Sequence, residues 1–568
     1  MPTKPCIINP NAKIQLPNAV LQITIKKGLI NIKSKNKKNT FMESVIVLMF
    51  SQFIIKIVGL IYKLYITNKE GFGDRGNAIY GAAFQIYALF LTVCSIGVPN
   101  AIAKLVSARV AMGDNKGAYR IFKIAFALFG FLGFISSSVL FFGANYIANT
   151  YLQIPETETA ILALAPSVFL VSVSSVLRGY FNGRENISVT ANSQSLEQIF
   201  KTLFTILMVE QIACISYNNT ILMASGATIA TTIATLFTLV YLYRYYIKRK
   251  KEMWQEVVSS KTHRKESVLK IIKKILIVSV PIALCALFSA TTKTIDALTI
   301  VRILKGMIGE ERATMQYGIL SGKVEALITL PYSFNIAFAT ALVPTISAAI
   351  AKKQTKDVER RIKFSLLVTI LIGLPCSICM SIFSNQILEL LFPNATAGGE
   401  MLKYSAWTII FVVLIQTING ALQGMGKVNV PAIAFAIGAV IKLVFNLILI
   451  PQVGVKGAII SSILSHITAF ITCFVSLKKN INIKFRIDKF LLKPIIASII
   501  MIISSYTLYI NLYNLISKNI LLIISLLFGI IIYMFSIIML KILAEEEFSM
   551  IPYGQKLYKK IKNVKHID

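Results

Sequence analysis

The segment Ser517–Lys541 reads SKNILLIISLLFGIIIYMFSIIMLK and holds no charged residue between its lysines at 518 and 541. The hydrocarbon core of a bilayer is about 30 Å thick, so a helix needs ~20 consecutive apolar residues to cross it. The whole chain is 55% hydrophobic and only 15% charged, whereas average soluble domains carry about 25% charged residues. A soluble protein this apolar could not bury its hydrophobic surface. The segment therefore predicts a transmembrane helix.

Similar apolar runs recur from residue 43 onward and predict an all-α membrane protein with about fourteen transmembrane helices. The expected spans are 43–66, 78–101, 120–146, 159–180, 190–212, 219–243, 270–291, 317–345, 362–384, 401–423, 431–451, 455–477, 490–513 and 517–541.

Basic residues give these spans a direction. The net charge is +34, from 59 Lys and Arg against 25 Asp and Glu. The bases cluster in short segments after the second, fourth, sixth, eighth and twelfth spans, whereas 147–158 carries only acidic charges. Lysine and arginine concentrate in cytoplasmic loops, so both termini are expected in the cytoplasm. Because no basic domain stands apart from the apolar runs, nucleic acid is not an expected partner. The exception is 292–316, which is basic although it is assigned to the outside.

Two parts of the chain resemble each other at a spacing of 241 residues (420 minus 179). Gly179-Tyr-Phe-Asn-Gly183 matches Gly420-Ala-Leu-Gln-Gly424, and the same spacing pairs Lys201 with Lys442. Since spans four and ten run in the same direction, the repeat unit has six spans, and spans thirteen and fourteen are an addition. Paired bundles of this kind suggest a central cavity and alternating access. As GxxxG strings, the paired glycines are compatible with close helix packing, but their place at predicted span ends favours a turn or a helix cap.

This reasoning divides the chain into six parts: a basic tail at 1–41, a first six-helix bundle at 42–243, a basic cytoplasmic linker at 244–269, a second bundle at 270–485, two additional helices at 486–545 and a basic tail at 546–568. The first forty residues hold eight lysines and no acid, and they lack the apolar core of a secretory signal. Two interpretations stay open: a tail that touches anionic lipid, or translation that begins at Met42.

Signatures of catalysis are not recognisable. The seven cysteines are scattered, and Cys376-Ser-Ile-Cys379 lies in an apolar run with no histidine nearby, so neither a metal nor a disulfide framework is expected. His466 is expected to be a packed core residue. The sequence has no phosphate-binding loop, and no Ser/His/Asp spacing stands out. We therefore expect neither an enzyme nor a cofactor.

Several strings resemble one known family. They are Gly59-Leu-Ile-Tyr-Lys63, Gly97-Val-Pro-Asn-Ala-Ile-Ala-Lys-Leu105, Leu177-Arg-Gly-Tyr-Phe-Asn-Gly183 followed by Glu197-Gln198, and Ala339-Thr-Ala-Leu-Val-Pro-Thr-Ile-Ser347. Their order resembles the multidrug/oligosaccharidyl-lipid/polysaccharide exporter superfamily, and within it the polysaccharide-transporter branch that holds stage V sporulation proteins and Gram-positive lipid II flippases. The resemblance covers roughly residues 42–545.

The resemblance implies a flippase in the bacterial cytoplasmic membrane that exports an undecaprenyl-pyrophosphate-linked saccharide, with the peptidoglycan precursor lipid II as the expected substrate. A monomer is expected, with a proton or sodium ion as a coupling partner. A vegetative and a sporulation role stay open. Two alternatives remain: a drug/cation antiporter of the same superfamily, and a membrane-embedded glycosyl transferase or ligase.

Bases at membrane depth are the expected substrate-binding residues. A diphosphate carries about two negative charges, and a charge in the bilayer costs ~2.5–3.5 kcal/mol, so a base that is retained there is a functional candidate. The candidates are Lys56, Lys63, Arg178, Lys201, Lys293, Arg302 and Lys442. Snorkelling of Lys63 to the interface and a loop anchor for Arg178 are the structural alternatives.

Three acids are the expected coupling or ion-pair residues, namely Glu197, Asp296 and Glu325. Glu197 lies four residues before Lys201, so the two could form an ion pair on one helical face. Lys293 and Asp296, three residues apart, can also share a face. The repeat places Gly438 opposite Glu197, so this glutamate breaks the symmetry of the two halves.

Overall fold

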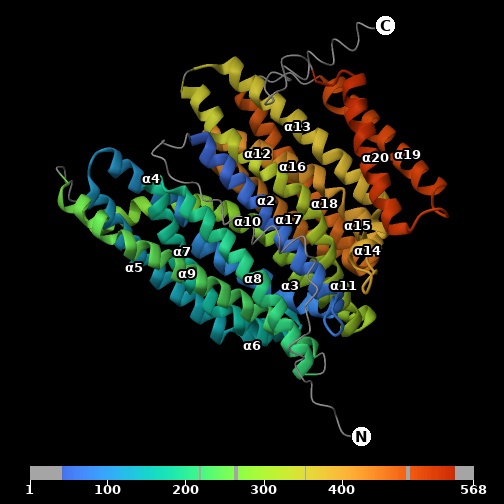
Figure 1. Ribbon diagram of the computed structural model, residues 1–568, viewed down its shortest axis with the longest axis horizontal. Helices are drawn as coiled ribbons and strands as arrows, with labels where there is room; N and C mark the ends of the chain where they lie inside the picture. The colour runs from blue at the N-terminus through green and yellow to red at the C-terminus, as the bar shows by residue number, and fades with distance from the viewer. Residues whose placement is uncertain (1–40, 217–218, 261–265, 352, 482–485, 544–568) are drawn as a thin grey trace.

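The computed structural model describes residues 41–216, 219–260, 266–351, 353–481 and 486–543, and over these ranges the chain is helical, with no β-strand (Figure 1). Twelve helices in the described ranges are long and apolar enough to cross a membrane. Each of the fourteen expected spans falls on a helix. The two that are not among the twelve are α2 (Phe41–Asn68) and α12 (Glu325–Ala351). The number fourteen and the cytoplasmic termini therefore stay predictions.

The first half of the chain forms α3 (Gly73–Leu91), α4 (Val98–Ala111), α5 (Asn115–Phe142), the short α6 (Ala144–Tyr146), α7 (Glu158–Gly183), α8 (Ile187–Ile215) and α9 (Thr220–Val258) after α2. The second forms α10 (Val268–Ile308), α11 (Glu310–Gly318), α12, α13 (Thr355–Ile382), α14 (Ser384–Leu391), α15 (Gly399–Ser405), α16 (Thr408–Gly424), α17 (Asn429–Val453) and α18 (Val455–Asn480), followed by α19 (Lys493–Asn511) and α20 (Lys518–Met539).

The packing of the first half recurs in the second. Helix α2 packs on α8 as α10 packs on α17, and α4 packs on α7 as α12 packs on α16. The pairs α8 with α9 and α17 with α18 repeat in the same way. A duplicated six-helix unit predicts this pattern. Helices α19 and α20 pack on each other and contact the second bundle through α13 and α14, at its outer edge (Figure 1).

Two basic segments that were expected to be connections are largely helical. Helix α9 continues to Val258, well into the expected linker 244–269, of which residues 261–265 lie outside the described ranges. Helix α10 continues to Ile308, so Lys293 and Arg302 lie on a helix of 41 residues and not in an outer loop. The expected tail at 546–568 and all but the last residue of the tail at 1–41 lie outside the described ranges, which begin at residue 41 and end at residue 543.

The four repeated glycines are sites of close helix packing, so the expectation of turns or caps was incomplete. A Cβ at Gly179 would lie 2.9 Å from the Cα of Pro99 on α4, and one at Gly420 would lie 2.5 Å from the carbonyl oxygen of Ala339 on α12. Gly183 and Gly424 meet the same two helices one turn further along. A side chain at any of these positions would push two helices apart.

We expect Gly420→Ala to destabilise the protein by about 1–3 kcal/mol, because the added methyl group overpacks a backbone contact. The matched control is Gly130→Ala on α5, where a Cβ would have no neighbour within 4 Å. Alanine favours a helix over glycine by about 1 kcal/mol, so Gly130→Ala is expected to be neutral or stabilising. Thermal unfolding of both purified variants tests this contrast, and equal melting temperatures would contradict it.

Candidate functional site

Two adjoining hollows lie among the helices. The first, which we call the lysine hollow, has a volume of about 330 Å³ and lies between the two bundles, lined by α2, α3, α8, α10 and the segment around the start of α12. The second, which we call the amide pocket, has a volume of about 590 Å³ and lies within the first bundle, lined mainly by α3, α4, α7, α8 and α9. They share Ile55, Phe84, Gln198 and Lys201.

The lysine hollow brings together five of the candidate residues: Lys56, Lys63, Lys201, Lys293 and Glu325. The Lys293 ammonium forms an ion pair with the Glu325 carboxylate at 3.1 Å. Within the described part of the chain, the other three lysines form no ion pair with a carboxylate at 4.0 Å or less. The hollow therefore keeps an excess of positive charge, although it lies in the middle of an apolar protein.

Aromatic rings hold two of these lysines. The Lys201 Nζ lies 4.3 Å from the centre of the Phe84 ring, and the Lys63 Nζ lies 4.9 Å from that of Tyr80. Tyr62 is also near Lys201, at 5.7 Å. A ring face attracts a cation without neutralising it. These contacts thus attract two ammonium groups inside the protein without pairing them with a carboxylate.

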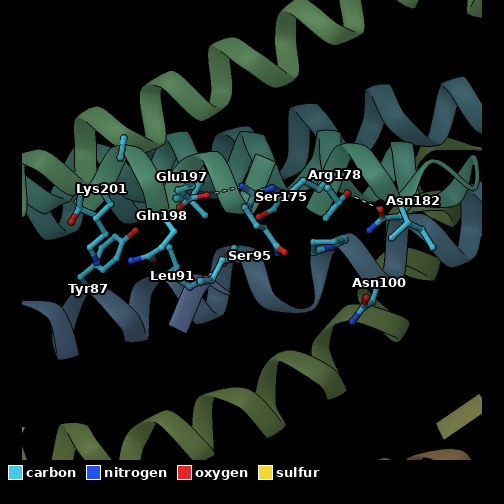
Figure 2. Close-up of a pocket in the computed structure, with 18 of the residues that line it drawn as sticks. Tyr87, Leu91, Ser95, Asn100, Ser175, Arg178, Asn182, Glu197, Gln198 and Lys201 are labelled. Carbon is cyan, nitrogen blue, oxygen red and sulfur yellow. Dashed lines mark hydrogen bonds and ion pairs between the residues drawn. The ribbon is translucent and has the colours of Figure 1, made fainter. Parts of the chain in front are cut away.

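The predicted pair of Glu197 with Lys201 is wrong. The Glu197 carboxylate instead accepts from the Arg178 guanidinium at 2.6 Å, across from α8 to α7 (Figure 2). Arg178 also donates to the Ser193 hydroxyl at 2.9 Å. Glu197 and Lys201 are four residues apart and share one face of α8. The guanidinium of Arg178 on the neighbouring helix nevertheless reaches the Glu197 carboxylate, with a geometry that suits a charged hydrogen bond.

Apart from Lys201, the other polar side chains that line the amide pocket are uncharged. Sequence reasoning missed most of these side chains because single amides and hydroxyls in apolar helices give a weak signal. They lie on α3, on α4 and the turn before it, and on α7, α8 and α9: Tyr87, Ser95, Asn100, Ser175, Asn182, Thr190, Gln194, Gln198 and Thr231. Figure 2 labels Tyr87, Ser95, Asn100, Ser175, Asn182 and Gln198.

Lys442 does not line either hollow. It is 2% exposed and pairs with Asp296 of α10 at 2.7 Å, with the Ser462 hydroxyl as a further partner. Asn446 donates to the second carboxylate oxygen of Asp296 at 3.1 Å. Lys201 and Lys442, which the repeat spacing pairs, therefore do not face the same hollow. Lys293 and Asp296, although three residues apart, have different partners.

Arg302 is exposed on α10 and lines neither hollow. A second buried pair was missed: Lys323, which is 0% exposed, pairs with Asp74 of α3 at 2.8 Å and donates to the carbonyl of Ala395 at 2.6 Å. It joins the two bundles at one end. The partners are 249 positions apart, so no local pattern could have linked them. In the described ranges, no group of three or more His, Cys, Asp or Glu side chains is placed to hold a metal ion.

Known proteins are similar to the chain in sequence and in fold. Stage V sporulation protein B of Bacillus subtilis (strain 168) is 25% identical over 82% of this chain and 89% of that protein, and the lipid II flippase MurJ of the same organism is 24% identical over 80% and 85%. The solved lipid II flippase MurJ in an inward closed conformation has a TM-score of 0.62 at 14% identity, covering 86% of this chain and 98% of that one.

A multidrug resistance MATE family transporter of the MOP superfamily, solved in an inward-facing conformation, has a TM-score of 0.63 at 13% identity, covering 77% of this chain and 98% of that one. These likenesses confirm the expected superfamily and a multi-pass helical membrane fold. The family model described as "Lipid II flippase MurJ" matches residues 153–527. Because this match covers more than half of the 568 residues, the chain belongs to the lipid II flippase MurJ family.

Proposed function

We propose that the chain is a flippase for a lipid-linked saccharide with a diphosphate in its head group, and that lipid II is its substrate. The observation that carries the proposal is a set of three lysines in the lysine hollow, Lys56, Lys63 and Lys201, that form no ion pair with a carboxylate of the described residues. A diphosphate with about two negative charges complements them. Family membership supports the same activity.

The position of the hollow supports alternating access as the mechanism. It lies between two bundles of similar packing, and a relative rotation of such bundles would expose it to one side of the membrane and then to the other. The Lys323–Asp74 pair closes the contact between the bundles at one end. The saccharide would cross inside the protein while the lipid tail stays in the bilayer of the bacterial cell membrane.

The two alternatives fit the hollows less well. A cation antiporter needs carboxylates that are free to bind a cation, yet the acids that line the two hollows, Glu197 and Glu325, each pair with a base. A glycosyl transferase or ligase that works through a carboxylate needs one that is free to move a proton, and the same pairs occupy both carboxylates that line the hollows. We therefore propose a transporter and not an enzyme.

Reconstitution into liposomes tests the proposal. With a labelled lipid II in one leaflet, the purified protein is expected to increase the fraction that a membrane-impermeant reagent reaches from the other side. Empty liposomes and the Lys201→Glu variant are the controls. Transport of cationic dyes without movement of lipid II would favour the antiporter, and formation of a new glycosidic product would favour the transferase.

Coupling to an ion can be measured in the same vesicles. The expected coupling residues Glu197, Asp296 and Glu325 each pair with a base, namely Arg178, Lys442 and Lys293. A proton or a sodium ion that binds one of these acids must therefore compete with a bound ammonium or guanidinium. We propose that an imposed proton gradient changes the rate of translocation more than an imposed sodium gradient, because a proton needs only one carboxylate oxygen.

A further inference from the structure

Helix α8 carries a row of polar side chains along one face. Thr190, Gln194, Glu197, Gln198 and Lys201 follow at intervals of four, three, one and three residues, which is the spacing of one helical face, and all five line the amide pocket. Figure 2 shows Glu197, Gln198 and Lys201 on this side of the helix. Polar groups in a membrane-spanning helix are costly and are retained mainly where they are used.

Helix α17 of the second bundle can be compared with α8, because the repeat pairs their positions. At the repeat spacing of 241 residues, the positions of Thr190, Gln194, Glu197 and Gln198 are taken by Pro431, Phe435, Gly438 and Ala439. Helix α17 nevertheless packs on α18 and α10 as α8 packs on α9 and α2. The architecture therefore forms without these polar side chains. The row on α8 is better explained by a ligand than by folding.

The chemistry of the pocket indicates what kind of ligand it takes. The acid and the arginine that line it, Glu197 and Arg178, form an ion pair at 2.6 Å. Their charges therefore cancel. Apart from Lys201 at the junction with the lysine hollow, the remaining polar groups are amides and hydroxyls, which both donate and accept hydrogen bonds. Ring hydroxyls and acetamido groups of a sugar need this combination. The volume of about 590 Å³ lies within the range of small-ligand pockets.

We infer that the amide pocket is the saccharide subsite and that the lysine hollow holds the diphosphate, an assignment that rests on the proposed function. Gln198 and Lys201 line both hollows and mark the junction between sugar and diphosphate. The saccharide then extends from Lys201 toward Asn182 and lies within the first bundle (Figure 2). The second bundle contributes to the diphosphate side of the site and not to the sugar.

A binding experiment with two matched probes tests this division. One probe is a polyprenyl diphosphate, and the other is the same lipid diphosphate carrying one N-acetylhexosamine, both titrated into purified full-length protein in detergent. The wild type is expected to bind the sugar-bearing probe about tenfold more tightly, since a few neutral hydrogen bonds contribute about 1.4 kcal/mol in total.

The test variant is Gln194→Phe combined with Ser175→Ala, at two positions that line the amide pocket and not the lysine hollow. It is expected to lose the tenfold preference and to bind the bare diphosphate within about twofold of the wild type. Lys56→Ala is expected to weaken both probes equally. Ile199→Ala, on the exposed side of α8, is the matched control and should change neither affinity.

The outcomes separate the inference from the proposed function. A double variant that keeps the tenfold preference overturns the saccharide subsite, and so does a wild type that binds both probes equally. A wild type that binds neither probe overturns the proposed function itself. If the double variant does not elute as a folded protein, Ser175→Ala alone decides, and it is expected to reduce the preference for the sugar-bearing probe by about threefold.

Discussion

Lys442→Ala is expected to destabilise the protein by about 3–5 kcal/mol and to lower its folded yield, because the substitution leaves the buried Asp296 carboxylate without its charged partner. Lys442 is 2% exposed and its ammonium lies 2.7 Å from Asp296. Removing one partner of such a pair costs far more than the pair itself contributes. Thermal unfolding of the purified variant measures the loss.

Two comparisons make this result specific. Lys456→Ala breaks an exposed pair with Glu400 of similar length, 2.8 Å, and it is expected to leave the melting temperature nearly unchanged. Lys442→Met together with Asp296→Asn removes both charges and is expected to recover most of the lost stability. If Lys442→Ala unfolds at the wild-type temperature, the pair has no structural role and Lys442 returns to the list of substrate-binding candidates.

Lys201→Glu is expected to reduce translocation by about a hundredfold with little loss of folded protein. The reversal replaces an ammonium that faces both hollows with a carboxylate, so the anionic head group meets repulsion where it met attraction. Two unit charges a few ångströms apart interact by about 1–4 kcal/mol between water and a protein surface, and 1.4 kcal/mol corresponds to a factor of ten. Initial rates in the liposome assay measure the effect.

The matched changes are Lys201→Arg and Lys116→Glu. Arginine keeps the charge and its contact with the Phe84 ring, so Lys201→Arg is expected to retain most of the activity. Lys116 lies exposed in the first turn of α5, outside both hollows, so its reversal should leave the rate unchanged. Wild-type translocation by Lys201→Glu would remove the electrostatic basis of the proposed function.

The fold was largely predictable because each transmembrane helix follows from the apolar residues of its own segment. Each run of about twenty apolar residues must be a helix in a bilayer, where every backbone polar group needs an internal partner. The repeat then gave the order of the two bundles, through Lys201 with Lys442 and through the paired glycines. The length of α10 was not predictable in the same way, because Thr291 to Ile308 is too polar to resemble a span and yet continues the helix.

The site was predictable as a set of charges but not as a set of pairs. Lys56, Lys63, Lys201, Lys293 and Glu325 do meet in one hollow. Whether a given base is free or neutralised depends on neighbours that are distant in sequence, as in Lys323 with Asp74 or Lys442 with Asp296. Helical periodicity describes one face of one helix and cannot report which helix lies opposite it.

Helix α10 is attached to both bundles, and this has a mechanical consequence. Near its start, Glu266 pairs with Arg109 of α4 at 2.6 Å, and the carbonyl of Ser279 packs against Gly97. Further along, Asp296 pairs with Lys442 of the second bundle. Helix α10 is thus fixed to the first bundle near its start and to the second bundle around Asp296. A relative rotation of the bundles would therefore bend α10 between Ser279 and Asp296. Pro281 lies in this segment and has no N–H for a helical hydrogen bond, so the helix is expected to bend there most easily.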